Sequence, residues 1–177
     1  MMVGRSVSFV TEKEEAKPKD VVLQISDLIV NENRGVPAVK ELSLDVHAGE
    51  IVGVAGIDGN GQSELIQAIT GLRKVKSGSI KIKGREVVGL SPRKITEMQV
   101  SHVPEDRHRD GLVLEMMLSE NIALQTYYKE PLSNKGVLNY NQINSYARKL
   151  MEEFDVRAAS ELVPAGALSG GNQQKAI

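Results

Sequence analysis

A glycine-rich stretch between an apolar run and a helix-like segment is the feature that most restricts how this chain can fold. Residues 51–55 form a short apolar run, which predicts a central strand covered on both faces. The next residues are Gly56, Ile57, Asp58, Gly59, Asn60, Gly61, Gln62 and Ser63. Apolar residues then recur as far as residue 70 and a glycine follows, which predicts a helix with a glycine stop. This order indicates an α/β fold with a phosphate-binding loop.

The loop has the spacing G-x-x-x-x-G-K-[ST], but Gln62 stands where the lysine is expected. Glycines let the backbone N–H groups surround a phosphate, and the following helix adds its positive dipole end. A neutral hydrogen bond from Gln62 contributes about 0.5–1.5 kcal/mol, against about 1.5–3 kcal/mol for a charged one. Asp58 and Glu64 add negative charge, while Ser63 could offer a hydroxyl to Mg²⁺. A glycine-rich turn that binds no ligand is the alternative interpretation.

The remaining patterns divide the chain into a mixed part and a helical part. Further strands are predicted at residues 21–26, 42–46, 79–83 and 100–103. A short helix is expected from Ser91-Pro92 to about residue 98. Apolar residues in 141–154 recur at helical spacing and predict a longer helix. We predict a linker over residues 1–20, an α/β core with an antiparallel β part over 21–112, and a helical subdomain over 113–177.

Composition excludes several classes of protein. Lys and Arg number 22 against 23 Asp and Glu, so bulk charge does not favour nucleic-acid binding. There is no cysteine, which excludes disulfides and thiolate chemistry, and no apolar run is long enough for a transmembrane helix. Residues 10–126 contain no Phe, Tyr or Trp, so that stretch offers nothing on which a base could stack.

A second motif lies near the end of the chain and is preceded by the helical part. Its residues are Leu168, Ser169, Gly170, Gly171, Asn172 and Gln173. Alone, LSGG would fit any helix that begins at a serine. After a phosphate loop and a helical insertion, however, it resembles the signature of ABC-type ATPases. The resemblance implies a P-loop NTPase-like core with a mixed sheet, in which the signature faces a nucleotide held by a partner domain.

The residues between the two motifs narrow the resemblance. Residues 103–112 are similar to the VPEDR…GL stretch of tandem ABC subunits that energise sugar and nucleoside importers. Glu105 stands where most ABC ATPases carry the glutamine that senses Mg²⁺ and links to the membrane partner. LSGGNQQK and GIDGNGQSEL look like the signature and the altered phosphate loop of the second nucleotide-binding domain in such proteins. The Gln62 variant favours the nucleoside branch over the ribose or galactose branch.

This resemblance implies cofactors, partners and a location. ATP or ADP with Mg²⁺ is expected to bind weakly or not at all at the loop, while the signature completes the ATP site of the first nucleotide-binding domain in the same polypeptide. Transmembrane permease subunits are the other direct partners, a solute-binding lipoprotein is an indirect one, and nucleic acid is not expected. The expected location is the cytoplasmic face of the plasma membrane.

Two absences in the sequence qualify the expected activity. Residues 21–46 lack the aromatic on which ABC domains usually stack adenine. The Mg²⁺-binding aspartate and the catalytic glutamate of the family would follow residue 177, so we expect a soluble fragment of a domain, truncated after the signature and inactive in ATP hydrolysis. A stand-alone P-loop NTPase or kinase is a rival hypothesis that needs a lysine at position 62. A non-catalytic interaction module that kept the fold without binding nucleotide is another.

Overall fold

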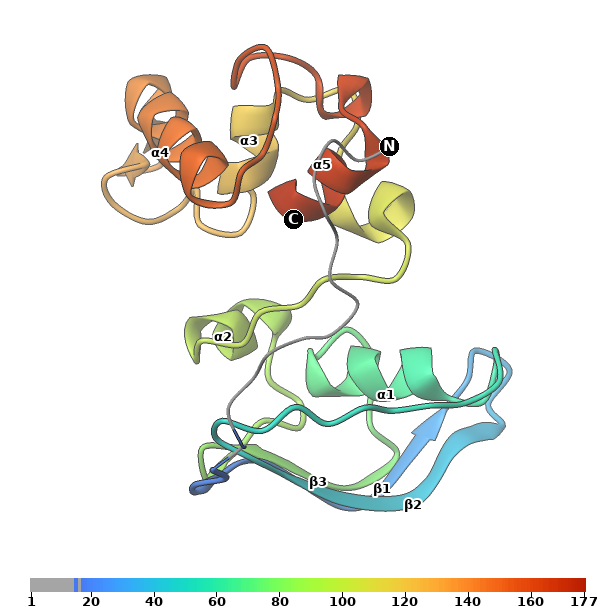
Figure 1. The fold of residues 1–177 in the computed structure, drawn as a ribbon. Coiled ribbons are helices and arrows are strands. Elements are labelled where there is room, and N and C mark those ends of the chain that lie inside the picture. The colour runs from blue at the N-terminus through green and yellow to red at the C-terminus, as the bar shows by residue number, and fades with distance from the viewer. Residues whose placement is uncertain (1–14, 16) are drawn as a thin grey trace. The chain divides into compact units, whose positions relative to one another are not determined.

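The computed structural model describes residue 15 and residues 17–177, and it divides into two compact units. One unit ends at Val100 and contains the main sheet, whereas the other is Ser101–Ile177 and is mainly helical (Figure 1). Residues 1–14 and 16 of the predicted linker lie outside the described residues. The predicted boundary between the α/β part and the helical part, after residue 112, stays a prediction.

A four-stranded antiparallel sheet forms the base of the first unit. Its strands, in spatial order, are β2 (Pro37–His47), β1 (Val21–Asn31), β3 (Ser77–Ile82) and β4 (Arg85–Glu86). Ile25 of β1 lies opposite Leu44 on one side and Ile80 on the other, which aligns the apolar faces of the strands. The strands predicted at residues 21–26, 42–46 and 79–83 are confirmed, and so is the pairing of β3 with the chain after Gly84.

Two short helices cover this sheet, and its core is aliphatic. They are α1 (Gln62–Ile69) and α2 (Pro92–Glu97), both predicted. Gly71 follows α1 with a φ of 76°, so the glycine stop is confirmed. The buried core consists of Ile25, Leu28, Val30, Val39, Leu65, Ala68, Ile80, Ile82, Val87 and Ile95. The buried core of this region without aromatic residues is therefore built from aliphatic side chains alone.

Two predicted strands are wrong. Residues 51–55 are irregular and solvent-exposed, with 98% of Ile51 and 57% of Val54 accessible. Residues 100–103 are irregular as well, and 58% of Val103 is exposed. A strand needs neighbours with which to hydrogen-bond, and no strand among the described residues pairs with either segment. The apolar composition of a segment indicates that it favours burial. It does not show whether a neighbouring strand is available to pair with it.

The second unit is built around α3 (Leu118–Ala123), α4 (Tyr140–Glu153) and α5 (Gly170–Ala176). A small hairpin, β5 (Ser133–Asn134) and β6 (Val137–Leu138), joins α3 to α4. The helix predicted at residues 141–154 is confirmed as α4. Its Ile143 packs with Ala123 and Leu132, whereas 56% of Phe154 at the end of the predicted apolar face is exposed.

One buried asparagine organises the segment before α3. Asn121 is 7% exposed, and its Oδ1 accepts from the N–H of Val113 at 2.8 Å. Its Nδ2 donates to the carbonyls of Val113, Met116 and Met117 at 3.0, 3.2 and 3.0 Å. The backbone of that segment also bonds to the chain before the signature, because Ala165 N donates to Met116 O at 3.0 Å. Asn121 therefore holds residues 113–117 in place, and these residues in turn bind the chain just before the LSGG segment.

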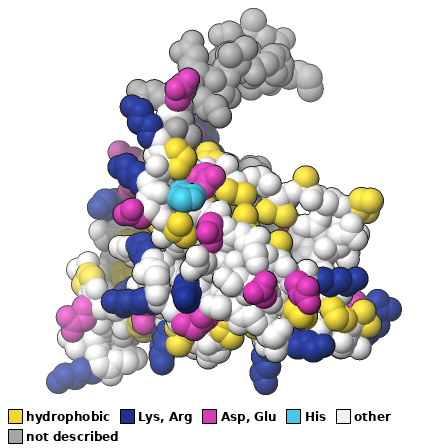
Figure 2. Space-filling view, turned by 90° about the horizontal axis from the view of Figure 1, so that it is seen from below, with side chains coloured by type: hydrophobic (Ala, Val, Ile, Leu, Met, Phe, Trp, Pro, Cys, Tyr) yellow, Lys and Arg dark blue, Asp and Glu magenta, His cyan; other side chains and the backbone are white. Residues whose placement is uncertain are grey.

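The exposed side of the molecule in Figure 2 carries lysines and arginines interspersed with aspartates and glutamates. Lys81, Lys83 and Arg85 on the edge of the sheet are exposed, and Lys83 Nζ donates to Gln99 Oε1 at 2.8 Å. Mixed signs give no strong single-sign field for a charged polymer.

Candidate functional site

The glycine loop turns directly into α1 through residues with left-handed backbone. Gly61 is the N-cap residue, with a φ of 96°, and a Cβ there would lie 2.6 Å from the carbonyl oxygen of Ala38. Only glycine fits this close approach and this φ without strain. Asn60 N donates to Ile57 O at 3.1 Å, which closes a tight turn. Residues 51–60 are exposed, so the loop is open to solvent.

The side chain of Gln62 folds back into this loop. Its Nε2 donates to Ile57 O at 3.3 Å. A Cβ added to Gly56 would collide with the same nitrogen, so the carboxamide rests against the Cα of that glycine. The residue that replaces the lysine of the motif is thus used to close the loop on itself.

The charges around the loop do not favour a bound phosphate. Residues 56–64 include Asp58 and Glu64 but no lysine or arginine, so anion binding there would depend on backbone N–H groups. Ser63 is exposed at the second position of α1, where its hydroxyl could join phosphate oxygens and water around Mg²⁺. No group of three or more metal-binding side chains occurs in the part of the chain that the structure describes. The loop fits a nucleotide phosphate only through its backbone.

A π-helical turn, η1 (Arg107–Gly111), follows the exposed Glu105. Asp106 caps it, because its Oδ1 accepts from the N–H groups of His108 and Arg109 at 3.0 and 3.1 Å. These bonds, that from Arg109 foremost, hold the pKa of the Asp106 carboxyl below its usual value. The cap fixes the direction in which Arg107 and His108 leave the segment.

The LSGG segment begins α5. Ser169 is its N-cap residue, and its exposed hydroxyl accepts from Asn172 Nδ2 at 3.1 Å instead of capping a backbone N–H. Gly171 is exposed, and a Cβ there would meet nothing within 4 Å. A Cβ on Gly170 would instead lie 2.8 Å from an Nη atom of Arg107. Ser169 and Gly171 therefore face open space, whereas Gly170 lies under a guanidinium.

Gln173 turns inward, unlike Ser169. The residue is 5% exposed, and its Nε2 donates to Ala165 O at 3.2 Å. Its Oε1 accepts from Arg107 Nε at 3.3 Å and lies 2.9 Å from His108 Nε2. The structure thus brings the segment after Glu105 against the signature helix. Sequence reasoning missed Arg107 and His108, because partners more than 60 positions apart leave no local pattern.

The other side of α5 is tied to the end of α4. Asn172 Oδ1 accepts from Arg157 N at 2.9 Å, and Lys175 Nζ donates to the carbonyl and the carboxylate of Asp155 at 2.8 and 2.9 Å. The bond from Lys175, followed by that from Arg157, lowers the pKa of the Asp155 carboxyl. The signature helix is therefore held on two sides by side chains of its own motif.

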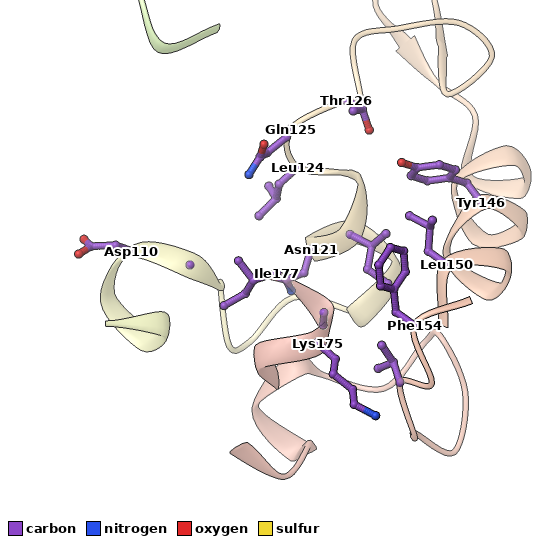
Figure 3. A pocket seen from close by; sticks show the side chains of 14 residues that line it. Asp110, Asn121, Leu124, Gln125, Thr126, Tyr146, Leu150, Phe154, Lys175 and Ile177 are labelled. Atoms are coloured by element: carbon purple, nitrogen blue, oxygen red, sulfur yellow. The ribbon is translucent and has the colours of Figure 1, made fainter. Parts of the chain in front are cut away.

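The second unit also contains a cavity of about 500 Å³ between α4 and the end of α5 (Figure 3). Tyr146 and Leu150 line it from α4, Phe154 lines it from just after that helix, and Ile177 lines it from the last described position. Thr126 contributes a buried Oγ1 with no hydrogen-bond partner among the described residues. A cavity of this size, lined by apolar side chains and by polar ones such as Asp110, Gln125 and Lys175, can receive a large side chain or a small molecule.

Comparison with known proteins shows the family to which the chain is similar. Residues 39–177 match the family model described as ABC transporter. The chain is 71% identical over its full length to the nucleoside import ATP-binding protein NupA of Lactococcus lactis and 56% identical to the guanosine import ATP-binding protein NupO of Bacillus subtilis. It spans 35% of the length of each of these relatives.

Solved structures of low sequence identity share the fold. The ATP-binding cassette MJ1267 of an ABC transporter superposes with a TM-score of 0.68 at 19% identity, over 89% of this chain and 63% of its own. The dimeric cassette MJ0796 superposes with a TM-score of 0.69 at 20% identity, over 87% of this chain and 66% of its own. These likenesses confirm the predicted fold class, an ATPase core with an antiparallel β part and a helical subdomain.

Proposed function

Because the chain belongs to the ABC transporter family, we propose that it is an ATP-binding component of an importer for nucleosides or simple sugars. The observation that carries this proposal is an intact LSGG segment, with Ser169 and Gly171 open to solvent, in a chain whose own phosphate loop lacks lysine. The names of the relatives, which include nucleoside and guanosine import proteins, support the solute class. As part of this proposal, the likeness of the two motifs to those of tandem ABC subunits leads us to place the chain in the second nucleotide-binding domain.

The signature acts on a nucleotide held by the first nucleotide-binding domain. Ser169 offers its hydroxyl, and the backbone at Gly170 and Gly171 offers N–H groups, to the phosphates of that nucleotide. Such donors are set in place before the nucleotide arrives, so they stabilise developing negative charge without reorganisation. Leu168 and Asn172 complete the same segment, whereas the buried Gln173 holds it from behind.

The loop at residues 56–64 forms the weaker of the two sites. A phosphate there would have to displace the Gln62 carboxamide from Gly56 and Ile57, and it would meet no positive side chain. ATP or ADP with Mg²⁺, the ligand class of the family, therefore binds this loop weakly at best and is not turned over there. Ser63 is the residue that would contact the metal ion when the nucleotide is bound.

The partners follow from the same assignment. The first nucleotide-binding domain receives the signature, the transmembrane permease subunits contact the helical unit, and a solute-binding lipoprotein delivers the solute to the permease. Among the described residues, no helix combines the length and the apolar character that a membrane span requires. The protein works at the cytoplasmic face of the plasma membrane through its permease.

Two measurements test this function. In the full-length protein assembled with its permease, Ser169→Glu places a negative charge against the partner's nucleotide and should lower ATP turnover by about 10- to 100-fold. Isothermal calorimetry on Gln62→Lys should show tighter ATP binding than the wild type, with Gln174→Lys on the exposed face of α5 as the control for added charge. Unchanged turnover in Ser169→Glu would contradict the role of the signature. Unchanged affinity in Gln62→Lys would contradict the weakened loop.

The closure of the loop by Gln62 also favours a second candidate, an interaction module that kept the fold without binding nucleotide. Calorimetry with ATP and ADP up to millimolar concentration separates the two. Measurable heat with a thermal shift supports a weak nucleotide site, and the absence of both supports the module.

A further inference from the structure

The buried carboxamide of Gln173, on the signature helix, contacts the segment after Glu105. Its Oε1 lies within hydrogen-bonding distance of both Arg107 Nε and His108 Nε2, at 3.3 and 2.9 Å. Its Nε2 donates to Ala165 O at 3.2 Å, in the turn that precedes LSGG. One side chain thus joins the signature helix to the turn just before it and to a segment more than 60 residues earlier in the sequence.

Arg107 also contacts the signature at a second point. Its guanidinium lies over Gly170, where a Cβ would come within 2.8 Å of an Nη atom. The pair of contacts, one to Gln173 and one over Gly170, leaves α5 little freedom to slide or rotate relative to η1. A packed contact with defined hydrogen bonds on both sides shifts as a unit and does not stretch.

Resting on the function proposed above, we infer that Gln173 is a positioning residue that couples the Glu105 segment to the signature. A displacement of the Glu105 segment moves Arg107 and His108, and through the carboxamide of Gln173 it moves Ser169 and Gly171 relative to the partner's nucleotide. The coupling is reciprocal, so a movement of the signature onto the partner's nucleotide also displaces the Glu105 segment. Gln173 does not touch the nucleotide itself, because the residue is 5% exposed.

The experiment uses the full-length protein assembled with its permease in lipid nanodiscs. Gln173→Leu keeps the volume of the side chain but removes all three hydrogen bonds. Gln173→Glu keeps an acceptor for Arg107 and His108 and adds a charge that Arg107 can pair, but it replaces the donor to Ala165 O with a carboxylate oxygen. Gln174→Leu is the matched control, because Gln174 is the next residue on the same helix and is exposed.

We expect Gln173→Leu to lower kcat for ATP hydrolysis by about tenfold or more with KM for ATP within about twofold, because misplaced groups cost turnover more than binding. Gln173→Glu should recover most of kcat, and Gln174→Leu should match the wild type. Equal kcat in Gln173→Leu and Gln174→Leu overturns the inference, as does a Gln173→Glu protein as slow as the leucine variant. If Gln173→Leu does not fold, Gln173→Glu decides alone, with near wild-type kcat supporting the coupling and reduced kcat overturning it.

Ser169→Glu in the same preparation separates this inference from the function on which it rests. Unchanged turnover in Ser169→Glu means that the signature does not serve the partner's site, and the proposed function fails. Reduced turnover in Ser169→Glu with normal turnover in Gln173→Leu means that only the coupling fails.

Discussion

Gln62 and Gln173 are the same residue type, and each lies close to a glycine pair where a helix begins, yet the structure uses them in opposite ways. Gln62 is the first residue of α1, and its side chain bonds back to Ile57 O and rests against Gly56 in the exposed loop before the helix. Gln173 is buried and bonds to Arg107, His108 and Ala165, which leaves Ser169 and Gly171 facing solvent. A glycine-rich helix start is therefore open or closed to ligands according to where its nearest long polar side chain finds partners.

The largest expected effect is a loss of stability in the second unit, Ser101–Ile177, when the hydrogen bonds of Asn121 are removed. Asn121→Leu removes four hydrogen bonds and leaves the N–H of Val113 without its acceptor, although the three carbonyls keep backbone partners, so the free energy of unfolding should fall by about 2–4 kcal/mol. All four tyrosines lie at residues 127–146, so tyrosine fluorescence during urea unfolding reports on this unit. Asn141→Leu on the exposed side of α4 is the control, and an equal effect from both variants would contradict the role of Asn121.

A smaller effect is expected at the other glycine-rich helix start. Gly61→Ala should destabilise the first unit by about 1–3 kcal/mol, because the added Cβ meets Ala38 O at 2.6 Å and φ is 96°. Circular dichroism during urea unfolding measures this change. Gly53→Ala, where a Cβ meets nothing within 4 Å, should leave stability nearly unchanged. Tolerance of alanine at Gly61 would show that the loop does not need its left-handed backbone.

The signature glycines should separate stability from activity. Gly171→Ala is expected to raise the free energy of unfolding by about 0.5–1 kcal/mol, since alanine suits a helix better and the site is open. It should nevertheless lower ATP turnover in the full-length protein, because the methyl group stands where the partner's nucleotide would approach. Gly170→Ala should not gain this stability, because it displaces Arg107. Full turnover in Gly171→Ala would contradict the signature as a nucleotide contact.

The smallest effect concerns the clasp between α4 and α5, which is the group of bonds from Lys175 and Arg157 to Asp155. Hydrogen bonds from Lys175 and Arg157 hold the pKa of Asp155 below its ordinary value of 3.8, so its contribution to stability is present above that pH and is lost as the pH falls through the lowered pKa. The wild type should therefore lose stability faster than Asp155→Asn below about pH 4. Urea unfolding at pH 3 and pH 6 measures the difference. Parallel curves for the two proteins would show that the exposed clasp contributes nothing measurable.

The elements that sequence reasoning predicted well are those whose signals are local. Helix α4 was predicted within one residue at each end, because its apolar residues repeat at helical spacing. The hairpin of β3 and β4 was predicted from the glycine that separates its strands. The strands predicted at residues 51–55 and 100–103 are absent, because a buried strand depends on partner strands that its own composition does not specify.

By itself, the sequence determined the α/β character of the first unit, the helices α1, α2 and α4, and the order of a lysine-free glycine-rich loop and an LSGG segment. These follow from spacing, glycine positions and periodicity, all of which act over a few residues. Only the tertiary structure decided that Gln62 closes its loop and that Gln173 joins the signature to the segment after Glu105. Side-chain direction depends on which partners the fold brings within hydrogen-bonding distance, and the partners of Gln173 at residues 107 and 108 lie 66 and 65 positions away.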